Sequence, residues 1–157
     1  MKRETLFLKI ALVLIGLPIF ALAMFILPII AREAAIYYPA YLVYSIIGSI
    51  YITAIPFYFA LYQAYKLLSY IDKNNAFSEL SVKSLKYIKY CATMIGCIYG
   101  AGMPFFYYIG EKDDAPGLIL IGIVFTIAPV VIAVFAAVLQ KLLQNAIDIK
   151  QDNDLTI

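Results

Sequence analysis

The chain has 157 residues, of which 64% are hydrophobic and 14% are charged; its net charge is +2 and it contains no histidine. A soluble domain has about 45–50% apolar and about 25% charged residues. The composition therefore excludes a disordered chain, a nucleic-acid-binding protein and a conventional soluble domain. The lack of histidine removes histidine-based catalysis and histidine metal sites. We expect one membrane domain, residues 1–157.

Four charge-free runs predict four transmembrane helices: residues 10–31, 34–65, 90–110 and 115–140. A helix needs roughly 20 apolar residues to cross a ~30 Å hydrocarbon layer. The second run exceeds one crossing, and the aromatic and proline residues at 37–39 mark its excess. We expect an all-α integral membrane protein, a four-transmembrane-helix bundle with spans at about 10–31, 40–67, 88–110 and 115–140. A proline in every span predicts kinks.

Lysine and arginine gather on one side of these spans. Ten of the twelve lie in or beside the N-terminal segment, the loop 68–87 and the tail 141–157. By the positive-inside rule, both termini and this loop face the cytoplasm. Residues 21–23 resemble a signal-peptide cleavage site, but the apolar run continues eight residues further, which favours a retained first helix.

The four charge-free runs place no ionised side chain inside the membrane. Ion-coupled pumps place charges inside the membrane, and an intramembrane hydrolase needs a base or a metal ligand. We therefore expect neither an ion-coupled pump nor an intramembrane hydrolase. We expect no enzymatic activity of any kind and no cofactor. The acids Glu111, Asp113 and Asp114 lie in a short loop on the opposite side, where they solvate a turn.

Tyrosine recurs every seven residues along the second span, from Tyr37 to Tyr65. Seven residues return a helix almost to the same face, so these side chains form a stripe. The stripe is either a helix–helix interface or an aromatic-lined cavity for a lipid, a peptide or an apolar small molecule. The residues that would line such a cavity are Tyr44, Tyr51, Tyr58 and Tyr62.

The loop before the third span contains a helix start. Ser78 suits the N-cap position of a helix, and the helix dipole favours an acid such as Glu79 in the first turn. From Glu79 the chain is predicted to run as one helix into the third span. Its lysine stripe, Lys83, Lys86 and Lys89, either meets anionic lipid headgroups or forms a docking surface for a cytosolic protein.

Residues 139–147 carry apolar side chains at helical spacing, so the fourth helix is predicted to continue as an amphipathic helix. The remaining residues are acidic and end in Leu155, Thr156 and Ile157. This end is either frayed or a short motif that binds a partner by strand addition or by capture of its carboxylate.

The four short spans, the Phe77-Ser78 pair before Leu85 and Ile88, and the ending at 153–157 together resemble a known family. It comprises the uncharacterised small bacterial membrane proteins, including YoaS, that share a domain of unknown function. Its members are commonly encoded beside a very small helix-turn-helix regulator. The resemblance implies a membrane protein that binds or sequesters a DNA-binding partner.

We therefore predict a non-enzymatic protein of the bacterial cytoplasmic (inner) membrane, regulatory in role, that contacts the lipid bilayer and does not bind nucleic acid directly. It holds a small cytosolic DNA-binding regulator through its loop and tail, and it can form a homo-oligomer. The alternative is a small transporter or immunity-type protein that binds an apolar ligand or lipid along the tyrosine face. The candidate partner-binding residues are Phe77, Lys83, Lys86, Lys89, Asp154, Leu155, Thr156 and Ile157.

Overall fold

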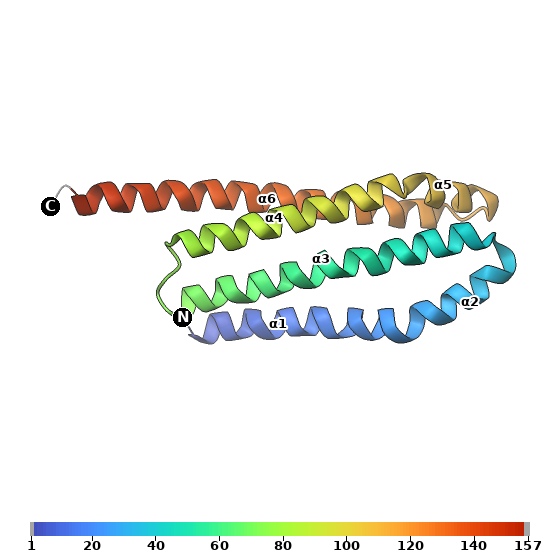
Figure 1. Ribbon diagram of the computed structural model, residues 1–157, viewed down its shortest axis with the longest axis horizontal. Coiled ribbons are helices and arrows are strands. Elements are labelled where there is room, and N and C mark those ends of the chain that lie inside the picture. The colour runs from blue at the N-terminus through green and yellow to red at the C-terminus, as the bar shows by residue number, and fades with distance from the viewer. Residues whose placement is uncertain (1, 156–157) are drawn as a thin grey trace.

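The computed structural model describes residues 2–155, which are helical apart from short connections. The elements are α1 (Lys2–Ala21), the π-helical segment η1 (Leu22–Ile26), α2 (Leu27–Tyr37), α3 (Ala40–Asp72), α4 (Glu79–Ala101), α5 (Met103–Lys112) and α6 (Pro116–Leu155). Figure 1 shows the long helices side by side, with the N-terminal and C-terminal ends of the chain at the same end.

The helix boundaries follow local chemistry. Pro39 caps α3, which begins at Ala40 as predicted and continues to Asp72, beyond the predicted end of the second span at residue 67. Ser78 caps α4, as its position before Glu79 predicted. Only residues 73–78 separate α3 from α4, so most of the predicted loop 68–87 is helical.

The prolines distort two of the long helices. In the first, α1 contains Pro18 and passes through the π-helical segment η1 into α2, whose first turn contains Pro28. The predicted third span is divided between α4 and α5, which meet at a bend of 41°. Gly102 lies at this bend, and Pro104 in the first turn of α5 supplies no N–H to α4.

The helix order gives an open layer. Extensive contacts join α1 to α3, α3 to α4 and α4 to α6, and α5 also packs on α6. Within residues 2–155, α1 and α6 lack the extensive contacts that would close a four-helix bundle. The predicted bundle is therefore corrected to a layer in the order α1, α3, α4, α6, as Figure 1 shows.

Three continuous helices are long and apolar enough to cross a membrane, and the bent α4–α5 pair provides a fourth if it crosses as one span. Helix α6 packs closely against α4 and α5 at glycine residues. A Cβ at Gly96 would lie 3.1 Å from Val130 Cγ2, and one at Gly122 would lie 2.9 Å from Met103 Sδ. Small residues allow such close helix contact in membranes.

Candidate functional site

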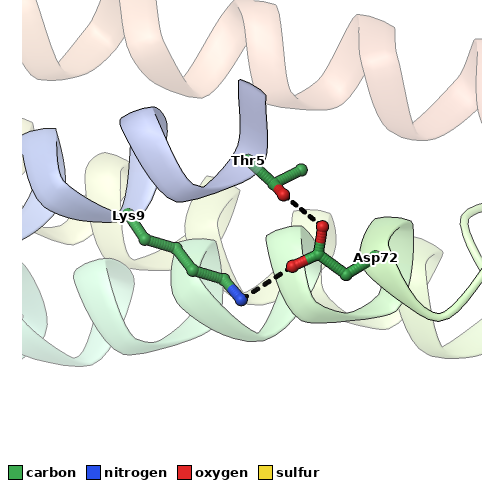
Figure 2. A network of polar contacts seen from close by, with 3 residues as sticks. All are labelled: Thr5, Lys9 and Asp72. Carbon is green, nitrogen blue, oxygen red and sulfur yellow. Dashed lines mark hydrogen bonds and ion pairs between the residues drawn. The ribbon is translucent and has the colours of Figure 1, made fainter. Parts of the chain in front are cut away.

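The start of α1 is joined to the end of α3 by a polar network. Lys9 Nζ lies 2.8 Å from Asp72 Oδ2, and the Thr5 hydroxyl donates to the other carboxylate oxygen (Figure 2). The Lys9 and Asp72 side chains are each about one-fifth exposed. We call this end of the layer, where α1 begins, α3 ends and α4 begins, the polar end.

The connection at the polar end is held by serines. The Ser78 hydroxyl accepts from the Ser81 N–H at 3.4 Å and donates to the Asn75 carbonyl at 2.8 Å. The buried Ser81 hydroxyl donates to the same carbonyl. This compact turn leaves the Phe77 side chain 58% exposed.

The last part of α6 extends past the polar end. Gln144 Nε2 lies 3.2 Å from Oε1 of Glu79, the first residue of α4, so α6 is level with the start of α4 at this point. Ile147 is still buried, whereas every residue from Asp148 to Leu155 is exposed. Figure 1 shows this part of α6 projecting beyond the other helices.

A groove of about 390 Å³ lies where Phe77 faces the projecting helix. We call it the tail groove. Ile149, in its lining, is 68% exposed, and Leu155, further along the projecting helix, is 84% exposed. The tail groove is lined by Phe77, Ala146, Ile149, Lys150 and Asn153.

The projecting helix is acidic. It carries Asp148, Asp152 and Asp154 against one lysine, Lys150. Its last turn contains no basic residue. Because the C-terminus of a helix bears partial negative charge, acids there are unfavourable and a cation is favourable. The projecting helix thus carries a net negative charge, whereas the charged residue that lines the tail groove is Lys150.

The structure brings together only part of the predicted partner surface. Phe77 lies in the tail groove, and Asp154 and Leu155 lie on the same projecting helix. The residues up to Leu155 are helical and not frayed, and the binding of a partner by this end stays a prediction. Thr156 and Ile157 lie outside the described residues.

Sequence reasoning missed four residues of the groove: Ala146, Ile149, Lys150 and Asn153. Their spacing of three, four and seven residues places them on one face of a helix. That signal was present in the sequence, but it requires the fourth helix to continue beyond residue 147.

The lysine stripe lies away from the tail groove. The Lys83 ammonium is 5.8 Å from the centre of the Tyr87 ring, and the Lys86 and Lys89 ammoniums are 5.9 Å and 4.9 Å from the centre of the Tyr90 ring. None of these lysines lines the tail groove. They form a second polar surface on α4.

The tyrosines of α3 divide into two groups. Tyr51 donates to the Ala23 carbonyl at 2.6 Å and Tyr58 to the Gly16 carbonyl at 2.8 Å, so both join α3 to the first helix. Tyr44 and Tyr62 are 71% and 54% exposed on the outer surface. These four side chains therefore do not converge on a common space.

An exposed apolar surface on long helices and a polar end with a projecting acidic helix define the class: a small multi-span helical membrane protein. The family model described as "Protein of unknown function (DUF2975)" matches residues 29–157. The chain is 63% identical to "Uncharacterized membrane protein YoaS" of Bacillus subtilis (strain 168), and the alignment covers 99% of each chain. No solved structure matches. The chain belongs to the DUF2975 family.

Proposed function

We propose that this protein is a non-enzymatic regulator in the bacterial cytoplasmic membrane and that it holds a small cytosolic protein in the tail groove. The observation that carries the proposal is the projecting end of α6, which exposes Ile149 beside Phe77 in the tail groove and leaves Leu155 exposed further along the helix. Large apolar side chains outside the lipid-covered part of a membrane protein are typical of a protein interaction site.

The location follows from the charge distribution. Residues 2–9, 66–89 and 141–157 contain ten of the twelve lysines and arginines. Positive residues in short loops are retained in the cytoplasm. The tail groove would then open to the cytoplasm, where a soluble partner can reach it.

The acidic projecting helix and the apolar lining of the tail groove together favour a basic partner that presents an apolar side chain. Asp148, Asp152 and Asp154 supply negative charge at the C-terminal end of a helix dipole, and Ile149 supplies the apolar contact. A small helix-turn-helix regulator has this chemistry, because its DNA-binding surface is positively charged. Binding at that surface would prevent the regulator from binding DNA.

The test uses the full chain in the membrane together with a small helix-turn-helix protein of the kind that the family resemblance implies as its partner. A photo-crosslinking residue at Ile149 should form an adduct with that protein, whereas the same residue at Tyr44 should not. The double variant Asp152→Lys/Asp154→Lys should lower recovery of the regulator about tenfold, equivalent to about 1.4 kcal/mol. The matched control, Asp113→Lys, reverses an exposed acid at the opposite end of the layer and should leave recovery unchanged.

Equal recovery with the intact and charge-reversed tails would contradict the proposal. An adduct at Ile149 that contains only a second copy of this chain would also contradict it, and would assign the tail groove to self-association.

A further inference from the structure

A second surface at the polar end combines lysine and tyrosine side chains. Four lysines from α3 and α4 each place their ammonium over a tyrosine ring, at 4.9–5.9 Å from its centre. We call this surface the basic–aromatic face. The pairs are Lys66 with Tyr62, Lys83 with Tyr87, and both Lys86 and Lys89 with Tyr90.

Helix geometry and one ring contact make this face continuous. On α4, Lys83, Lys86, Tyr87 and Tyr90 fall within about 100° of one another, opposite the buried side that includes Leu85. The Tyr87 ring packs edge-on against Phe59 of α3, with their centres 5.9 Å apart. Tyr62 and Lys66 follow Phe59 by three and seven residues, so they extend the same surface along α3.

Within residues 2–155, none of these four lysines forms an ion pair with a carboxylate. The ion pair at the polar end joins Lys9 to Asp72 instead. The nearby carboxylate of Glu79 accepts a hydrogen bond from Gln144. Four positive charges are therefore available to an external anion.

We propose that the basic–aromatic face binds the phosphodiester headgroups of anionic phospholipids. Tyrosine rings prefer the level of the headgroups, and lysines extend along the helix to place their charge in water or against phosphate. The acidic projecting helix would be repelled by the same lipids, which keeps the tail groove away from the membrane surface. This proposal does not depend on any protein partner.

The test compares phosphatidylglycerol with phosphatidylcholine on the full-length protein. The protein is extracted from an equal mixture of the two lipids, and native mass spectrometry measures which lipid it retains. The wild-type chain should prefer phosphatidylglycerol. A lysine near an anionic surface contributes about fivefold to binding, so Lys66→Gln/Lys83→Gln/Lys86→Gln should lose most of that preference.

Lys112→Gln is the matched control, because Lys112 also lies over tyrosine rings, those of Tyr38 and Tyr108, but comes from the opposite end of the layer. It should retain the preference. Circular dichroism confirms that the triple variant is folded. An unchanged preference in the triple variant, or an equal loss in the control, would overturn the proposal. A triple variant that no longer binds a protein partner but still retains phosphatidylglycerol would also overturn the proposal.

Discussion

The Tyr51 hydroxyl donates to a backbone carbonyl of the first helix, that of Ala23, which lacks its ordinary helical donor. Within η1, the Leu27 N–H donates to the Leu22 carbonyl, five residues back, and Pro28 has no N–H to donate. Neither residue therefore supplies the ordinary helical bond to the Ala23 carbonyl. Tyr51 donates to that oxygen at 2.6 Å. In lipid, an unsatisfied carbonyl is costly because no water replaces the lost donor.

We therefore expect Tyr51→Phe to lower the free energy of unfolding by about 1–3 kcal/mol, the cost of an acceptor that loses its donor where no water can replace it. Thermal unfolding in a mild detergent measures the change. Tyr44→Phe is the control, since the Tyr44 side chain is mostly exposed, and it should have little effect. Equal melting temperatures for the two variants would show that Tyr51 does not perform this role.

Asp72 has a comparable role between α1 and α3. Asp72→Ala removes the carboxylate that accepts from Thr5 and pairs with Lys9. Because the Lys9 and Asp72 side chains are partly solvated, we expect a loss of only about 1 kcal/mol. Limited proteolysis of the N-terminal segment should become faster, whereas Asp113→Ala at the other end of the layer should leave its rate unchanged. A rate unaffected by Asp72→Ala would argue that helix packing alone holds this segment.

The contact between α6 and the α4–α5 pair depends on the absence of side chains at its glycines. A Cβ at Gly122 would approach Met103 Sδ at 2.9 Å and Phe106 Cγ at 3.2 Å. The Phe106 side chain is buried, so it has little space into which it can move. This packing, more than helix propensity, determines how α5 folds back on α6.

We expect Gly122→Ala to destabilise the protein by about 1–3 kcal/mol through overpacking. The matched control is Gly48→Ala in the middle of α3, where a Cβ meets nothing within 4 Å. There the helix propensity of alanine should give neutral or increased stability. The two melting temperatures should change in opposite directions or differ by several degrees, and an equal response would argue against close packing at Gly122.

The molecule as a whole is an open layer with its charges concentrated at one end. If this end lies in the cytoplasm, residues 73 and 113 must lie on opposite sides of the membrane. In a background with Cys91→Ser and Cys97→Ser, Asp113→Cys should react with an impermeant maleimide in intact cells. Lys73→Cys should react only after the membrane is permeabilised, and the reverse pattern would overturn the proposed orientation.

Much of this architecture is local and could be predicted. Runs without charge predicted the long helices, Pro39 marked the start of α3, and Ser78 marked the start of α4. These predictions succeed because helices in lipid satisfy their own backbone hydrogen bonds, so their positions depend on neighbouring residues along the chain. Phe77, named among the candidate partner-binding residues, also lines the tail groove.

The open layer, the separate roles of the tyrosines and the tail groove were decided only by the tertiary structure. Lipid is as apolar as the side chains it contacts, so hydropathy does not reveal which face of a helix packs on another helix. Tyr51 and Tyr44 look equivalent in a seven-residue repeat, yet one donates to the first helix and the other faces outward. Likewise, Phe77 and Ile149 form one groove because α6 passes the start of α4, a relation between distant segments that no local pattern encodes.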